Sequence, residues 1–314
     1  MKNVAITGAA GFLGKKILDR LQEYSGIDTI VATDIKELPD KYYSDRIKFY
    51  RLDIRDKRLG ELFREHNVDT VIHLAFILDP IRQLDEMRSV NLEGSKNVLD
   101  SVRFCGANHL VVASSTSAFG AFPDNPEWLT EETPVREHPT FNYAADKYAV
   151  EQILNDFIVE NPRIKTAIIR PCIVYGPNVD NYISRMMRNW PFLVRVGRDC
   201  PPMQFVHEDD VAELFLLVLE REEEGIFHCV GEGVVTMYDI AAKAGKKVIP
   251  LPVWLAYPFT ALLYFLRIPL VEAPAPFLDF LRYRWTASDL ETRRKTGFKP
   301  RYSSEKVVEI LFEQ

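Results

Sequence analysis

A tyrosine and a lysine four residues apart stand near the start of an apparent helix, and this pair could do chemistry. Tyr143 and Lys147 occur in the stretch FNYAADKYAVEQIL, so they lie on one helix face with the ammonium near the phenol oxygen. A nearby cation lowers the pKa of a tyrosine, which would make Tyr143 a general acid or base near neutral pH. Ser115, at the end of the strand-like stretch HLVVASS, is expected to hydrogen-bond the substrate oxygen. The pair alone is common in sequences, and a surface pair without function would explain it equally well.

A glycine-rich motif supplies the context that the pair lacks. The stretch VAITGAAGFLG is a strand-like run that leads into three spaced glycines and then at once into an amphipathic helix. Glycines allow a tight turn and let the backbone approach a pyrophosphate, which the helix N-terminus stabilises. The motif therefore predicts a dinucleotide site, although a tight turn without a ligand is the alternative. The contacts expected here are Gly8, Gly11, Phe12, Leu13 and Gly14.

An acidic residue at the end of the next strand-like run selects the cofactor. Asp34 closes the stretch TIVATD about 20 residues after the glycines, where a carboxylate binds the adenosine ribose hydroxyls. Such a carboxylate repels a 2′-phosphate, so the sequence predicts NAD rather than NADP, with Ile35 beside the adenosine. Lys36 weakens this preference slightly.

Other predicted strands end in residues that could reach the same ligand, because ligands bind at the carboxyl ends of parallel strands. Asp53 and Ile54 in RLDIRD are expected beside the adenine, and Leu74 and Ala75 in VIHLAF beside the pyrophosphate. Each of these, taken singly, is explained at least as well by core packing. His73 is interpreted as an interior histidine whose ring nitrogens have partners.

The order of the predicted elements indicates the fold class. Short β-branched runs alternate with helical patterns through the first half of the chain, which is typical of βαβ units around a parallel sheet. We expect an α/β, Rossmann-type doubly wound sheet in residues 1–175, with a smaller mixed substrate-binding domain in residues 176–314. The strand-like run 225–231 could rejoin the first sheet.

Composition excludes several function classes. The chain has 314 residues, a net charge of −6 and no run of basic residues, so nucleic acid is not expected as a partner. Its four cysteines are far apart, show no metal-binding spacing and follow no secretory signal, which predicts reduced thiols, no bound metal and a cytoplasmic location. Prolines interrupt the uncharged stretch 248–266 and argue against a membrane span. Whether residues 253–266 form a lid over the nicotinamide, a core helix or a membrane-surface contact stays open.

Taken together, these motifs resemble the extended short-chain dehydrogenase/reductase family, of the NAD-dependent epimerase/dehydratase type. The stretches TGAAGFLG, VIHLA, VNLEGSKNVL, SSTSAFG, YAADK, RPCIVYGPN and FVHEDDVA follow the order of that family along nearly the whole chain. The resemblance implies that Tyr143 is the catalytic acid/base, that Lys147 binds the nicotinamide ribose and that Ser115 orients the substrate. It also places Asn91, Pro171 and Ile173 near the nicotinamide half of NAD. It further implies a homodimer in which residues 84–104 and 142–159 form a four-helix bundle with their copies.

Two positions depart from the pattern of the nucleotide-sugar enzymes in that family. Ile173 stands where those enzymes have a sugar-nucleotide-binding asparagine, and Met203 where they have a diphosphate-binding arginine. Arg195 and Arg198 could compensate. We therefore expect an NAD-dependent oxidoreductase that acts on a secondary alcohol or ketone small molecule. A nucleotide-sugar epimerase or dehydratase with tightly bound NAD is the alternative, and a non-catalytic NAD-binding sensor or scaffold is the third possibility.

Overall fold

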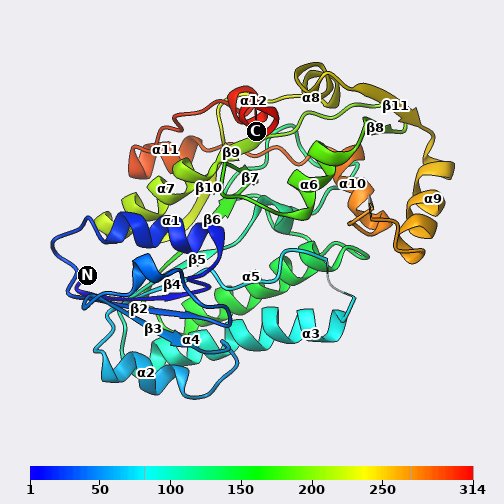
Figure 1. Cartoon of the computed structure of the whole chain (residues 1–314). Coiled ribbons are helices and arrows are strands. Elements are labelled where there is room, and N and C mark those ends of the chain that lie inside the picture. The colour runs from blue at the N-terminus through cyan, green and yellow to red at the C-terminus, as the bar shows by residue number, and fades with distance from the viewer. Residues whose placement is uncertain (81, 270, 314) are drawn as a thin grey trace.

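A seven-stranded parallel sheet forms the centre of the molecule (Figure 1). The structure, a computed structural model, describes residues 1–80, 82–269 and 271–313. In spatial order the strands are β10 (Gly225–Cys229), β6 (Lys165–Pro171), β5 (His109–Ala113), β4 (Thr70–His73), β1 (Asn3–Thr7), β2 (Thr29–Asp34) and β3 (Ile47–Arg51). The expected Rossmann-type sheet is thus confirmed, and the run at 225–229 pairs in parallel with β6 at its edge.

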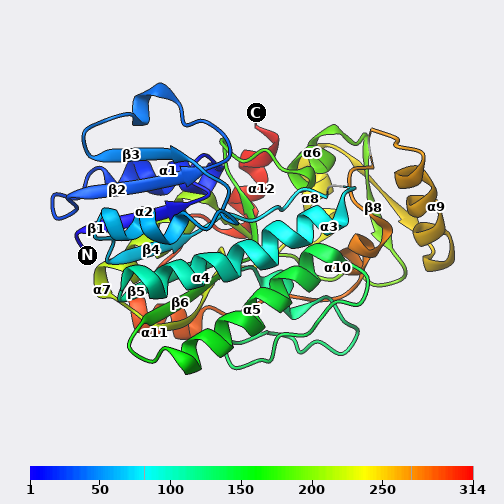
Figure 2. The same ribbon diagram turned by 90° about the horizontal axis from the view of Figure 1, so that it is seen from below.

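Successive residues of a strand point to opposite faces of the sheet, so the side chains of the strands contribute to two hydrophobic cores, one on each face. In β1, Val4 and Ile6 belong to one buried cluster and Ala5 to the other. The first cluster includes residues of α1 (Phe12–Leu21) and α7 (Glu208–Arg221). The second includes residues of α2 (Leu59–Glu65), α4 (Gly94–Cys105) and α5 (Asn142–Glu160). Figure 2 shows α4 and α5 side by side on this second face.

The direction of the chain reverses beside β1, and this reversal creates a binding crevice. The chain runs from β1 outward to β2 and β3, and then returns to place β4 on the other side of β1. In open parallel sheets, ligands bind at such a switch point, outside the carboxyl ends of the strands. The glycine-rich loop leaves β1 at this point.

The C-terminal half adds a smaller part with its own hydrophobic core, built around Tyr175, Phe205 and Val308. Its strands form two parallel pairs, β7 (Ile173–Tyr175) with β9 (Phe205–His207), and β8 (Phe192–Val196) with β11 (Lys247–Leu251). The remaining helices are α3 (Leu84–Arg88), which precedes a π-helical turn (Ser89–Glu93) and α4, and α6 (Tyr182–Asn189), α8 (Met237–Ala244), α9 (Val253–Phe265), α10 (Asp279–Arg282), α11 (Leu290–Thr296) and α12 (Ser304–Phe312). Short 3₁₀ helices cover Asp40–Tyr42, Thr116–Phe119 and Ala275–Leu278. Among the helices of the described ranges, none combines the length and apolar character that crossing a membrane requires.

Candidate active site

A cavity of about 680 Å³ opens at the carboxyl ends of the central strands, and it gathers nearly all of the predicted site residues. All of them except Asn91 line it: Gly8, Gly11, Phe12, Leu13, Gly14, Asp34, Ile35, Asp53, Ile54, Leu74, Ala75, Ser115, Tyr143, Lys147, Pro171 and Ile173. These residues come from widely separated stretches of the sequence, so only the sheet topology brings them together.

The glycine loop has no room for side chains. Gly8 has a φ of +75°, and a Cβ atom there would lie 2.6 Å from the backbone nitrogen of Ala75. A Cβ atom on Gly14 would collide with the backbone oxygen of Gly8. The loop therefore passes close to the end of β4 and leads straight into the N-terminus of α1, whose free N–H groups suit a pyrophosphate.

Asp34 is fixed beside this loop by two backbone hydrogen bonds. Its Oδ2 atom accepts one from the N–H of Ala10 (2.9 Å), and its Oδ1 atom accepts one from the N–H of Lys36 (2.9 Å). Each carboxylate oxygen can accept a further hydrogen bond, so Asp34 fits the two ribose hydroxyls of NAD. This fit and the close glycine turn agree with the dinucleotide predicted from the sequence.

Asp53, the second acid of the cofactor end, already has a charged partner. Arg55 Nη2 lies 2.7 Å from Asp53 Oδ2 and 2.8 Å from Glu86 Oε1. The hydrogen bonds from Arg55 hold the pKa of Asp53 below its usual value. Asp53 is thus an ionised hydrogen-bond acceptor at the cavity wall.

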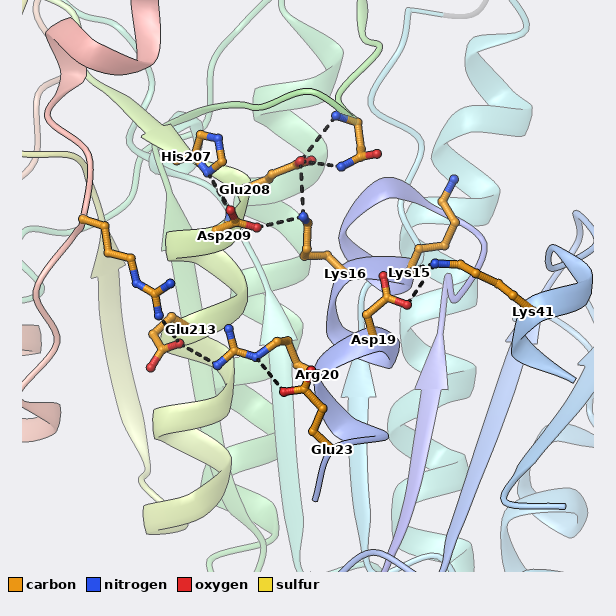
Figure 3. A network of polar contacts seen from close by, with 12 residues as sticks. Lys15, Lys16, Asp19, Arg20, Glu23, Lys41, His207, Glu208, Asp209 and Glu213 are labelled. Carbon is orange, nitrogen blue, oxygen red and sulfur yellow. Dashed lines mark hydrogen bonds and ion pairs between the residues drawn. The ribbon is translucent and has the colours of Figure 1, made fainter. Parts of the chain in front are cut away.

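A polar network ties α1 to the start of α7, as Figure 3 shows. Lys16 of α1 lies 2.8 Å from Asp209 and 3.5 Å from Glu208, both in the first turn of α7. Glu208 is fully buried and also accepts a hydrogen bond from the side chain of Asn178 (2.6 Å), which lines the cavity. Lys16 therefore connects α1 to the cavity wall contributed by the C-terminal half. Asp209 and the neighbouring Asp210 both lie in the first turn of α7.

Tyr143 reaches the cavity from the first turn of α5, next to Ser115. Burial raises the pKa of Tyr143 to about 12, and hydrogen bonds with the hydroxyls of Ser115 and Ser117 offset only part of this effect. Ser117 was not among the predicted site residues, although the run SSTS contains several hydroxyls. Ser115 itself caps the following 3₁₀ helix by accepting a hydrogen bond from the N–H of Ser117 (3.1 Å).

Lys147 lies on the same helix face as Tyr143, but its ammonium is held by other partners. Its Nζ atom donates to the carbonyl oxygen of Ala113 (2.8 Å) and lies 3.6 Å from the centre of the Phe76 ring, against 6.0 Å from that of Tyr143. Burial lowers the pKa of Lys147 to about 7, against the opposing effects of Glu151 and Asp146. Lys147 is not among the groups that shift the Tyr143 pKa, because its ammonium lies against other partners and burial is the largest cause.

A buried ion pair supports the strand ends below Ser115, and it was not predicted from the sequence. Glu151 of α5 pairs with Arg170 of β6 (2.5 Å), and both side chains are buried. The hydroxyl of Ser114 donates to Glu151 at 2.5 Å. In the sequence, Glu151 follows Lys147 by four residues, which places both side chains on the same helix face. This spacing is the signal from which a buried role of Glu151 could have been predicted.

Asn91 corrects one prediction, because it is fully buried behind the cavity wall. Its side-chain oxygen accepts from the N–H of Ile77 (2.8 Å), and its amide nitrogen donates to Asp146 (3.0 Å). The π-helical turn directs this side chain inward. Asn91 therefore positions the cavity wall and α5. His73, as predicted, is interior, with Thr7 and Ser95 hydroxyls at 2.7 and 3.0 Å from its ring nitrogens.

The far end of the cavity is mostly aromatic and aliphatic, and Asn178, Asp180 and Asn181 are its amide and acidic members. We define the substrate end as the lining contributed by Asn178, residues 180–183, Met203, Phe277, Phe280, Leu281 and Trp285. Ile173 and Met203 are both buried. Among the described lining residues that follow Lys147 in the chain, none is a lysine or arginine.

Two segments that could have contributed to this end do not line it. Arg195 and Arg198 do not line the cavity within the described part of the chain, and the Arg195 guanidinium donates to the backbone carbonyl of Arg198. They therefore supply no charge that replaces the missing arginine. The lid was one of three possibilities left open for residues 253–266; they form α9 (Val253–Phe265), which contributes no described residue to this cavity. With only Ala256 buried, α9 is no core helix either.

Comparisons with known proteins agree with this architecture. Residues 4–229 match the model of the NAD dependent epimerase/dehydratase family. A UDP-glucose 4-epimerase of Mycolicibacterium smegmatis is 32% identical over 247 residues, which cover 74% of this chain and 77% of that protein. The structure of a Thermus thermophilus UDP-glucose 4-epimerase in complex with NAD superposes with a TM-score of 0.74 at 25% identity, over 99% of this chain and 98% of the other. The dTDP-glucose 4,6-dehydratase of Bacillus anthracis, also in complex with NAD, shares the fold (TM-score 0.74, 17% identity, 100% of this chain and 96% of the other).

The glycine loop, the Tyr143–Lys147 helix and the matched model thus lead to one conclusion: this chain is an enzyme of the NAD-dependent epimerase/dehydratase family, with NAD as its cofactor.

Proposed function

We propose that this enzyme oxidises or reduces a secondary alcohol or ketone carbon of a weakly polar small molecule, with Tyr143 as the general acid/base. NAD, when bound, accepts or returns the hydride. The glycine loop would hold its pyrophosphate, Asp34 its adenosine ribose, and Lys147 its nicotinamide ribose. In this division, residues 1–175 together with β10 form the cofactor domain, and residues 176–314 mainly bind substrate.

The side chains around Tyr143 support this role. The phenol takes the proton from the substrate hydroxyl or returns it to the carbonyl oxygen, while Ser115 hydrogen-bonds the same oxygen. A Tyr143 pKa of about 12 is too high for a base at neutral pH. Positive charge brought near the phenol on cofactor binding lowers that pKa, so we expect Tyr143 to become active only in the NAD complex.

The observation that carries the substrate class is the lack of cationic side chains in the described substrate end. A diphosphate left without cations or donors in a partly buried cleft loses several kcal/mol. Ile173 and Met203 offer neither. Arg185 of α6 is already paired with Asp79 and Glu272 at 3.0 and 2.6 Å.

A nucleotide-sugar epimerase or dehydratase is the second candidate, supported by the 32% identity to a UDP-glucose 4-epimerase. The two candidates differ in cofactor turnover, because an epimerase regenerates its own NAD whereas a dehydrogenase accumulates NADH. A non-catalytic sensor is disfavoured by the joint placement of Ser115, Tyr143 and Lys147 in one cavity.

Assembly and location complete the proposal. We propose a homodimer in which residues 84–104 (α3, the π-helical turn and most of α4) and residues 142–159 of α5 pair with their copies as a four-helix bundle, supported by the exposed apolar side chains of Leu84, Phe104 and Val159. We also propose a cytoplasmic location, for which the wide spacing of the four cysteines in the sequence is the support. Sedimentation that finds only monomer at micromolar concentration would rule out the dimer.

A screen for NADH formation tests the proposed reaction. The purified enzyme with NAD is offered secondary alcohols of increasing apolar size, and in parallel UDP-, GDP- and dTDP-sugars. We expect NADH to accumulate with one or more alcohols, and Tyr143→Phe to abolish it. Interconversion of a nucleotide sugar without net NADH would select the second candidate instead.

A further inference from the structure

A second cavity, of about 440 Å³, lies in the C-terminal half and has no role in the reaction described so far. Its walls come from α6, β8, β11, α9 and the segment 271–281. Among the described residues that line it, Trp190 and Thr260 alone have polar side-chain groups, and none is charged. Its volume falls within the range of pockets that bind small molecules.

This second cavity adjoins the substrate end of the active site. Ile183, Phe277 and Leu281 line both cavities. The ring of Phe141 lies between Phe277 and the reacting group. Its centre is 6.0 Å from the ring centre of Phe277 and 6.2 Å from that of Tyr143. The two cavities therefore share a wall of apolar side chains, and this wall lies close to Tyr143.

Helix α9 forms the outer wall and is apolar on both sides. Phe259 and Leu263 line the cavity, and Phe259 is also 47% exposed, so the cavity reaches the protein surface beside this ring. The opposite side of α9 carries Trp254 and Phe265, each 76% exposed. In Figure 1, α9 lies at the edge of the molecule that is farthest from the N-terminal strands.

The apolar walls of the second cavity favour a hydrocarbon ligand over a polar one. A sugar or a nucleotide base would lose its hydrogen bonds to water in such a cavity without gaining replacements, which is unfavourable. A hydrocarbon chain has no such groups, and each buried methylene strengthens binding by roughly three- to fourfold. The surface opening beside Phe259 allows the end of a longer chain to remain outside.

We propose that the second cavity binds the hydrocarbon chain of the substrate, so that the enzyme acts on an amphiphilic alcohol or ketone whose reacting carbon lies near one end of an apolar chain. The inference rests on the proposed function for the identity of the reacting group. The cavity itself, however, can be tested by binding alone.

Two measurements separate the inference from the proposed function. In the first, kcat/KM is measured with NAD for straight-chain 2-alkanols from four to twelve carbons. We expect it to rise roughly three- to fourfold per methylene until the chain fills the cavity. In the second, binding of 2-decanol to the NAD complex of Tyr143→Phe is measured by calorimetry, which requires no turnover.

The matched variants are Leu263→Trp, which fills the cavity, and Leu262→Trp, which places the same ring on the exposed side of α9. Leu263→Trp should weaken 2-decanol binding at least tenfold, whereas Leu262→Trp should not. Equal NAD affinity and unfolding temperature of the two variants would show that both are folded.

Each outcome is decisive. Binding of 2-decanol that is lost only in Leu263→Trp supports the inference even if no alcohol is oxidised, in which case the proposed reaction fails alone. Turnover of alcohols without any dependence on chain length, and equally in both variants, overturns the inference and leaves the proposed function standing. If neither binding nor turnover occurs, both are wrong.

Discussion

The ammonium of Lys147 lies 3.6 Å from the centre of the Phe76 ring, which is a direct cation–π contact. Phe76 follows Ala75 at the cavity wall, where the strand β4 has already ended. The contact and the Ala113 carbonyl hold the ammonium away from the Tyr143 ring. Tyr143 itself is a buried phenol whose pKa is raised by burial.

The first prediction concerns the reacting group. Tyr143→Phe should lower kcat by about 10²–10⁴-fold, because it removes the proton donor and acceptor, and should leave NAD affinity nearly unchanged. Lys147→Ala should reduce both. Steady-state kinetics and NAD titration by fluorescence check this. Wild-type rates in Tyr143→Phe on a true substrate would show that another group moves the proton.

The second prediction concerns Lys147 and pH. Its folded-state pKa of about 7 lies below the ordinary value of 10.5, so between these pH values the unfolded chain binds more protons. The free energy of unfolding then rises with pH in this window. Lys147→Met removes this contribution, so its stability relative to the wild type should be greatest below pH 7 and should decline toward pH 10. Denaturant unfolding at several pH values measures this difference, and parallel pH curves would contradict it.

The third prediction concerns cofactor choice. The enzyme should bind NADH more tightly than NADPH, because a phosphate beside the Asp34 carboxylate is repelled. Asp34→Asn weakens charge-assisted hydrogen bonds to the ribose, worth about 1.5–3 kcal/mol, and should lower NAD affinity roughly tenfold or more. Asp28→Asn, an exposed acid before the other end of β2, is the control. Tighter binding of NADPH than NADH would instead indicate Lys36 as the determinant.

The fourth prediction concerns the buried pair below the active site. Glu151→Gln leaves the Arg170 guanidinium buried without its counter-charge and should cost about 3–5 kcal/mol of the free energy of unfolding. Asp100→Asn breaks an exposed pair with Arg103 on α4 and should change stability by less than about 1 kcal/mol. Urea unfolding compares the two variants. A similar small loss in both would mean that Arg170 finds another partner.

Local patterns predicted most of the cofactor end. The strand, the glycines, the helix and Asp34 are close in sequence, and their geometry follows from backbone sterics and the parallel sheet. The capping pair Thr236 and Asp239 is likewise a local signal, and both of its hydrogen bonds are present.

Contacts between distant segments could not be predicted in this way. The burial of Asn91 depends on Asp146 and Ile77, and the place of Lys147 depends on Phe76, which lies in another strand–helix unit. For the apolar stretch 253–266, a lid over the nicotinamide was one possibility. Its position beside the second cavity depends on the packing of β8 and β11. Such placements are set by tertiary packing, which periodicity does not encode.

The central claim is that the substrate end accepts an apolar molecule rather than a nucleoside diphosphate. Calorimetric titration of the NAD complex with UDP and with dTDP tests it most directly, because both nucleotides carry the diphosphate that Ile173 and Met203 cannot bind. We predict no detectable heat of binding at micromolar nucleotide. Micromolar binding of either nucleotide would contradict this proposal and support a nucleotide-sugar site.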